Sequence, residues 1–210
     1  MKILTLSTSS STTYLTLWEL NLDTSTVKSI NEVYDQLEII SKNIDTKFSI
    51  LENLSTLFDK TVNNDNYELI IIDKGPGSFT GIRTGIAFAK GLTINSVIPV
   101  RTVSILDAIG FQKYYLKPQS KIISQINAHN NNVYTNTLIF NKEGNIDNST
   151  RNITNLKKDS SFEEVNMTTI KSLTAIGIFD FIKNGTELPE KIIPLYGNPV
   201  NISKPKNEKI

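Results

Sequence analysis

The sequence predicts an α/β fold in which mixed sheets are flanked by helices. The first observation is the apolar run Leu69–Ile72, which is typical of a strand buried on both faces. The second is the segment that follows it, where the turn Lys74-Gly75-Pro76-Gly77-Ser78 leads into a helix predicted over residues 79–92. The third is the start of the chain, where residues 2–8 and 13–20 alternate as the two strands of a hairpin. A strand, a tight turn and a helix in this order indicate an α/β core.

Between the hairpin and the glycine turn, the pattern predicts a third strand over residues 32–40 and an amphipathic helix over residues 45–62, with Asp45 as its N-cap. Ser78 is the predicted N-cap of the helix over residues 79–92. A short strand over residues 95–100 and a helix over residues 102–115 follow. These elements make a first lobe, residues 1–101, and begin a second lobe, residues 102–200.

The second lobe is predicted to contain strands over residues 121–127 and 133–140, then a turn at residues 142–145 and a further strand. Residues 151–161 are polar and predict a loop. A short helix (163–172), a strand (173–178) and a last helical turn ending at Gly185 complete the lobe. The charged tail, residues 201–210, is predicted to be disordered.

Composition excludes several classes of chemistry. The 210 residues carry a net charge of +1, so no strong global field attracts nucleic acid. There is no cysteine, hence no disulfide, thiolate nucleophile or zinc–sulfur site. The N-terminus lacks the pattern of a signal peptide and no run is long enough for a membrane span, so we expect a cytoplasmic protein without membrane contact.

The helix after the glycine turn carries a ridge of small residues spaced four apart: Gly77, Gly81, Gly85 and Ala89. Each interior glycine costs about 1 kcal/mol of helix stability relative to alanine, so this face must be closely approached. A phosphate, a neighbouring strand or another helix could approach it. The spacing fits neither a P-loop nor a dinucleotide-binding fingerprint.

The string GPGSFTGIRTGIAFAKGL, residues 75–92, closely resembles the signature of the TsaB (YeaZ) family. This resemblance implies a two-lobed actin-like (RNase H-like, ASKHA) fold. It also implies a non-catalytic role, as the subunit that pairs with TsaD to transfer threonylcarbamoyl to N6 of adenosine 37 in tRNAs that read ANN codons. The expected partners are TsaD, TsaE through the heterodimer, a second copy when the protein is alone, and tRNA only within the complex. No metal or cofactor of its own is implied, and ATP would be bound mainly by the partner subunits.

By the same resemblance, the subunit interface is expected on the two first-lobe helices and the turn between strand and helix. The residues assigned to it are Phe48, Leu51, Phe58, Gly75, Gly77, Ser78, Phe79, Gly81, Ile82, Gly85, Ile86 and Ala89. A bulky side chain at Gly85 is then expected to abolish pairing and to leave the fold intact.

Several positions depart from the family pattern. Ser7 stands where an acidic residue usually ends the first strand, which argues against a hydrated Mg²⁺ there. The second-lobe loop around Asn127 lacks the usual charges, and Gly197 replaces an arginine. Asp73 is interpreted as structural or solvent-facing, and His129 as an exposed loop residue.

Catalytic alternatives have little support in this sequence. A nucleotide-dependent phosphotransferase on the same fold remains the second hypothesis, although it needs an acidic first loop that Ser7 does not supply. A self-acting peptidase is the third, and it would rest on His129, the single histidine. TsaD binds its metal with a pair of histidines, so this chain cannot be that enzyme.

Overall fold

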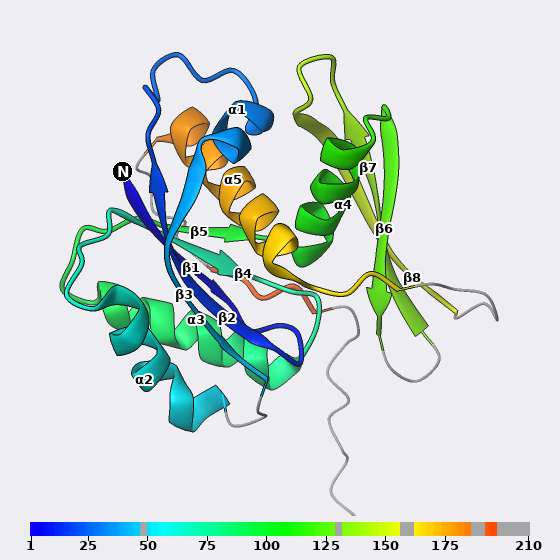
Figure 1. Cartoon of the computed structure of the whole chain (residues 1–210). Helices are drawn as coiled ribbons and strands as arrows, with labels where there is room; N and C mark the ends of the chain where they lie inside the picture. The colour runs from blue at the N-terminus through cyan, green and yellow to red at the C-terminus, as the bar shows by residue number, and fades with distance from the viewer. Residues whose placement is uncertain (47–49, 129–131, 156–161, 186–191, 197–210) are drawn as a thin grey trace, which may run out of the picture.

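The computed structural model describes residues 1–46, 50–128, 132–155, 162–185 and 192–196 as two sheets with five helices among them (Figure 1). The larger sheet has the strand order β3-β2-β1-β4-β5. Its strands are β1 (Lys2–Ser7), β2 (Thr13–Leu20), β3 (Leu37–Asp45), β4 (Leu69–Asp73) and β5 (Val100–Val103). β1, β2 and β3 pair antiparallel, whereas β4 pairs parallel to both β1 and β5.

Helices cover both faces of this sheet, as the continuous apolar strand β4 predicts. α2 (Ile50–Val62) and α3 (Phe79–Thr93) lie on one face, and α1 (Ile30–Asp35) and α5 (Met167–Asn184) lie on the other (Figure 1). The alternation of β1 and β4 supplies both cores. Leu4 and Ile70 join the core under α2 and α3, whereas Ile3 and Ile71 join the core under α5.

The smaller sheet has the order β6-β7-β8, with β6 (Lys121–Asn127), β7 (Asn132–Phe140) and β8 (Ile146–Asn155). α4 (Ile105–Leu116) packs on one face of it and also against α5. Leu138 and Phe140 from this sheet belong to the same hydrophobic core as Ile71. The two sheets are therefore joined through α4 and α5 by one continuous core.

α5 makes its closest contact with the larger sheet at Gly177. A Cβ built on Gly177 would lie 2.3 Å from Ile71 Cδ1, so only glycine allows the helix this near to β4. The Thr174 hydroxyl is hydrogen-bonded to that of Thr5 on β1 at 2.9 Å. Although α5 belongs to the predicted second lobe, it packs on the first-lobe sheet. The boundary between the two predicted lobes at residue 101 stays a prediction.

Several predicted elements are confirmed and others are wrong. The hairpin, β4, α3, β6, β7 and the end of α5 at Gly185 lie where the sequence places them. Residues 30–35, at the start of the predicted third strand, form α1, and the strand runs over 37–45 instead. Asp45 ends β3 opposite Thr13, so it does not cap a helix.

The remaining errors lie near β5, β8 and α5. Strand β5 starts at Val100, where the predicted strand over residues 95–100 ends. Residues 151–155, predicted as loop, belong to β8. The predicted strand over 173–178 is the middle of α5, whose residues are buried among α1, α4 and the sheet. A short apolar run cannot distinguish a strand from a buried helix.

Candidate functional site

The glycine turn joins β4 to α3 beside the loop that follows β1. Gly75 has φ +90°, a conformation that glycine adopts without strain. Ser78 caps α3 as predicted, because its hydroxyl accepts a hydrogen bond from the Gly81 amide at 3.1 Å. The Ser78 amide donates to the Ser9 carbonyl at 2.7 Å. The turn is thereby fastened to the loop after β1.

The small-residue ridge of α3 packs on this same loop and does not face outward. Cβ atoms built on Gly77, Gly81 and Gly85 would lie 2.2, 2.0 and 2.4 Å from atoms of residues 8 and 9. The Thr8 hydroxyl donates to the Gly81 carbonyl at 2.8 Å. The sequence left open a phosphate, a neighbouring strand or another helix, and the observed neighbour is none of these but the loop that follows β1. The glycines thus serve packing within the chain.

This placement corrects part of the predicted interface. Five of its residues are buried against the chain's own β1 loop and sheet, namely Gly81, Ile82, Gly85, Ile86 and Ala89. The expectation that a bulky residue at Gly85 would leave the fold intact is wrong, because it would collide with Thr8. Phe48 lies outside the described residues, and the side chain of Leu51 is not described.

Other predicted interface residues are accessible. Phe79 is 41% exposed at the start of α3, beside the exposed Ser78. Phe58 of α2 is half-buried, and its ring contacts Phe88 of α3 at 5.7 Å between centroids. We define the outer face of α2 and α3 by its accessible or half-buried side chains. They are Leu57, Phe58, Phe79, Ala87, Phe88 and Leu92.

Asp73 lies at the end of β4 and is fully buried. Its carboxylate accepts hydrogen bonds from the hydroxyls of Ser7 (2.9 Å) and Ser9, and from the Gly75 amide (2.7 Å). Burial raises the pKa of Asp73 above its ordinary value, and these hydrogen bonds oppose the shift. Asp73 is therefore structural, and its solvent-facing alternative is wrong. The hydroxyls of Ser7 and Ser9 donate to this carboxylate and are occupied by it.

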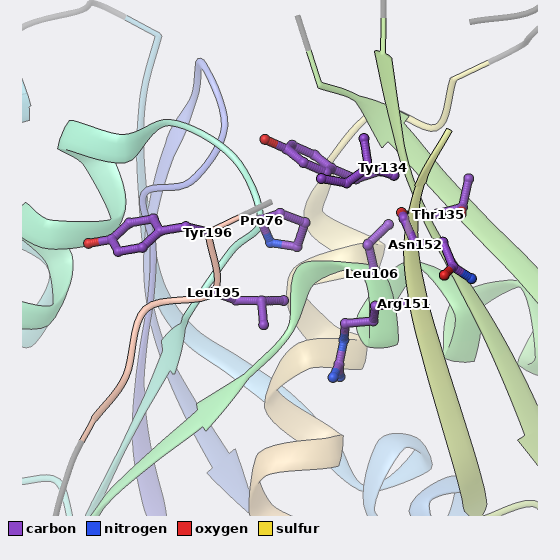
Figure 2. A pocket seen from close by; sticks show the side chains of 9 residues that line it. Pro76, Leu106, Tyr134, Thr135, Arg151, Asn152, Leu195 and Tyr196 are labelled. Carbon is purple, nitrogen blue, oxygen red and sulfur yellow. Dashed lines mark hydrogen bonds between the residues drawn. The ribbon is translucent and has the colours of Figure 1, made fainter. Parts of the chain in front are cut away.

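A cleft of about 370 Å³ lies between the glycine turn and the smaller sheet. Pro76 and Leu195 form one wall, and Tyr134 lies across from them, with Leu106 between (Figure 2). Leu195 is held there because its amide donates to the Lys74 carbonyl at 2.8 Å. The Tyr196 ring points away from Tyr134 and contacts Phe79, with 4.9 Å between ring centroids.

Arg151 lines this cleft, and further charged side chains lie near it. Arg151 of β8 pairs with Asp107 of α4 at 2.7 Å, and Asn136 donates to the same carboxylate at 2.6 Å. Burial raises the pKa of Asp107, which Arg151 opposes. Burial lowers the pKa of Lys74, and nearby Arg151 lowers it further. Sequence analysis missed this group because its members come from the turn after β4 and from α4, β7 and β8, and no spacing signals it.

The described part of the chain contains no group of side chains suited to binding a metal ion. Within residues 1–46, 50–128, 132–155, 162–185 and 192–196, no three histidine or acidic side chains are grouped so that they could hold an ion. Over the same residues, no helix has the length and apolar character needed to cross a membrane. His129 lies outside the described residues.

Comparison with known proteins agrees with this architecture. A family model described as "TsaD: tRNA N6-adenosine threonylcarbamoyltransferase" matches residues 50–184. The chain belongs to this family. A relative in Haemophilus influenzae, "tRNA threonylcarbamoyladenosine biosynthesis protein TsaB", is 32% identical over 75 residues, which is 36% of this chain and 32% of the relative.

Two solved structures from Pseudomonas aeruginosa share the fold. YeaZ has a TM-score of 0.62 at 14% identity, covering 87% of this chain and 93% of its own. A protein described as similar to peptidase YeaZ has a TM-score of 0.67 at 15% identity, covering 94% of this chain and 99% of its own. The predicted α/β fold with two sheets flanked by helices is thereby confirmed as the fold of YeaZ, and the predicted resemblance to TsaB (YeaZ) proteins is confirmed by these relatives. The aligned segments span 26–41% of the curated TsaB relatives.

Proposed function

We propose that this chain is the non-catalytic subunit that pairs with a TsaD protein in the complex that transfers threonylcarbamoyl to N6 of tRNA adenosine 37. Its family and the names of its relatives support the pathway. We place this activity in the cytoplasm, with tRNA and TsaE meeting the chain only within the complex. We further propose that it binds no cofactor of its own and that ATP is held mainly by the partner subunits.

The observation that carries the non-catalytic assignment is the burial of Asp73. It is the carboxylate nearest the glycine turn, and Ser7, Ser9 and the Gly75 amide all bond to it. A phosphotransferase needs an acidic group in this loop that faces a metal ion or a hydroxyl nucleophile. A peptidase needs a serine activated by a base, whereas both serines here donate to a carboxylate that is inaccessible. One histidine in the sequence also excludes a two-histidine metal site.

The outer face of α2 and α3 is the surface that we assign to pairing. It presents the exposed Phe79 together with Phe58 and Phe88, which are half-buried and pack against the core under α2 and α3. Aromatic side chains are typical of interface cores, where they bury much area at little entropic cost. Two helices offered by each partner would form a four-helix interface. In the absence of TsaD, the same face of a second copy can cover these rings, which gives a homodimer.

Light scattering coupled to size-exclusion chromatography tests this proposal. We expect the protein alone to elute as a homodimer, and an equimolar mixture with TsaD of the same organism to elute as a heterodimer. Ala87→Arg, on the exposed side of α3, should fail to pair, and the control is Thr150→Arg, which adds the same side chain at an exposed position of β8 on the smaller sheet and should still pair. If the chain elutes separately from TsaD at concentrations of about 10 µM and above, where pairs of micromolar affinity assemble, the proposed pairing is wrong.

A further inference from the structure

We propose that the cleft between the glycine turn and the smaller sheet binds a small planar organic anion, with its anionic group at Lys74 and Arg151 and its ring between Tyr134 and Leu195. This site lies on the opposite side of the larger sheet from α2 and α3. It meets the surface assigned to subunit pairing only at Tyr196, which lines the cleft and contacts Phe79. The chemistry shared by possible ligands is one ring that bears one carboxylate or one phosphate monoester.

The charge at the base of the cleft is incompletely balanced. Arg151 has Asp107 as its ion-pair partner, and Asn136 completes the bonding of that carboxylate. Within the part of the chain that the structure describes, the Lys74 ammonium has neither a hydrogen bond nor an ion pair, although it is half-buried. Two carboxylates act on Lys74 through their charge: Asp107, which is paired with Arg151, and Asp180, which is paired with Arg101. A half-buried cation without a partner is costly, and an anion from solution would supply the missing partner.

The position of Lys74 relative to Arg151 supports a shared ligand. The positive charge of Arg151 is near enough to lower the pKa of Lys74, and the negative charge of Asp107 raises it. Lys74 is the first residue of the turn whose Pro76 lines the cleft, and Arg151 lines the cleft itself (Figure 2). An ammonium and a guanidinium that converge from opposite lobes can bind one carboxylate or phosphate group together.

The walls select the remainder of the ligand. Pro76, Leu106, Ile153 and Leu195 are apolar, and Tyr134 adds an aromatic side chain from β7. Thr135 and Asn152 place polar groups at the rim on the side of the smaller sheet (Figure 2). Apolar walls with a few convergent polar groups are typical of small-molecule sites, and the volume lies at the lower end of their range of about 300–1,000 Å³.

A nucleoside triphosphate fits these observations less well. Its phosphates would need free donors in the loop after β1, but Ser7 and Ser9 donate to Asp73. The volume of about 370 Å³ also suits a single ring better than a base, a sugar and three phosphates. Of the two cations, Arg151 lies on β8 beside Asp107 of α4, and Lys74 begins the glycine turn, so the anionic group is expected between the turn and β8 and not at the Ser7 and Ser9 hydroxyls.

Titrations followed by ¹H–¹⁵N NMR test the site, with benzoate, phenyl phosphate and neutral benzyl alcohol as probes. We expect at least one of the two anions to shift the amide signals of residues 134, 153 and 195, and benzyl alcohol to bind more weakly. Lys74→Met should weaken anion binding by roughly tenfold or more, since it removes a charge-assisted hydrogen bond. Binding of benzoate alone would identify a carboxylate ligand, and binding of phenyl phosphate alone a phosphate monoester.

The matched control is Lys142→Met, the same change at an exposed position in the turn before β8, which should bind like the wild type. Lys74→Gln is a second variant that, like Lys74→Met, removes the positive charge, and it serves if Lys74→Met unfolds. Equal binding of benzyl alcohol, unchanged binding by both Lys74 variants, or binding of neither anion would overturn the proposal. The isolated chain is sufficient for this test. A negative result for anion binding therefore does not bear on the proposed pairing with TsaD, and a negative result for pairing does not bear on anion binding.

Discussion

The replacement Gly85→Ala tests whether the small-residue ridge of α3 is an internal contact. A Cβ at this position would lie 2.4 Å from the Thr8 hydroxyl oxygen, well inside van der Waals contact. That hydroxyl cannot move away freely, because it donates to the Gly81 carbonyl at 2.8 Å. The helix or the loop after β1 must therefore shift to admit a single methyl group.

The magnitude follows from three contributions. Overpacking a tight internal contact costs about 1–3 kcal/mol, and disturbing the Thr8 hydrogen bond costs about 1 kcal/mol. Alanine returns about 1 kcal/mol through its better helix propensity. We therefore expect Gly85→Ala to lower the free energy of unfolding by about 1–3 kcal/mol.

Urea unfolding followed by circular dichroism measures this loss. Gly91→Ala is the matched control on the same helix, because a Cβ there meets nothing within 4 Å, and it should raise stability by about 1 kcal/mol. Combining Gly85→Ala with Thr8→Ala removes the colliding oxygen. The double variant should therefore lose less free energy of unfolding than the sum of the losses of the two single variants. If Gly85→Ala proved as stable as Gly91→Ala, or if Thr8→Ala gave no relief, the internal packing of the ridge would be refuted.

Three further predictions concern Asp73, Lys74 and the pairing face. Asp73→Ala should lower the free energy of unfolding by about 3 kcal/mol, because it leaves buried donors of the first loop unpaired; a loss below about 1 kcal/mol in urea unfolding would contradict this. Burial lowers the pKa of Lys74 from 10.5, so the folded chain releases this proton at lower pH than the unfolded chain. Its contribution to stability therefore rises with pH across that window. In urea unfolding near neutral pH, Lys74→Met should therefore be more stable than the wild type. The difference in unfolding free energy should shrink as the pH approaches about 10.5, and a difference that stays constant would disprove the lowered pKa of Lys74. Ala87→Arg, on the exposed side of α3, should keep the melting temperature and lose the heterodimer with TsaD in light scattering; co-elution at the wild-type ratio would remove this face from the interface.

The sequence predicted the glycine turn and α3 well because their signals are local. Gly75 needs a left-handed backbone, Ser78 caps the helix, and β4 is continuously apolar, so each residue agrees with the element it occupies. Periodicity also identified the correct face of α3 as closely approached. It could not say what approaches, since the partner, Thr8, is separated by more than seventy residues and brought near by the pairing of β1 with β4.

The wrong predictions also arise because tertiary contacts between distant segments decide the structure. Residues 173–178 of α5 are apolar and β-branched in part, which suits a strand, yet burial against α1, α4 and the sheet stabilises them as helix. The charged group at the cleft was missed entirely. Lys74, Asp107 and Arg151 come from separate elements, and only the packing of the smaller sheet beside the glycine turn brings them together.

Reconstituted transfer of threonylcarbamoyl to tRNA tests the central claim most directly. Purified TsaD and TsaE of the same organism, supplied with ATP and an activated threonylcarbamoyl donor, would be assayed for modified adenosine in a tRNA that reads ANN codons, with and without this chain. The proposed function predicts modification only when the chain is present, no modification by the chain alone, and loss of modification with Ala87→Arg. Full activity without the chain, or modification by the chain alone, would contradict its assignment as a non-catalytic subunit that TsaD requires.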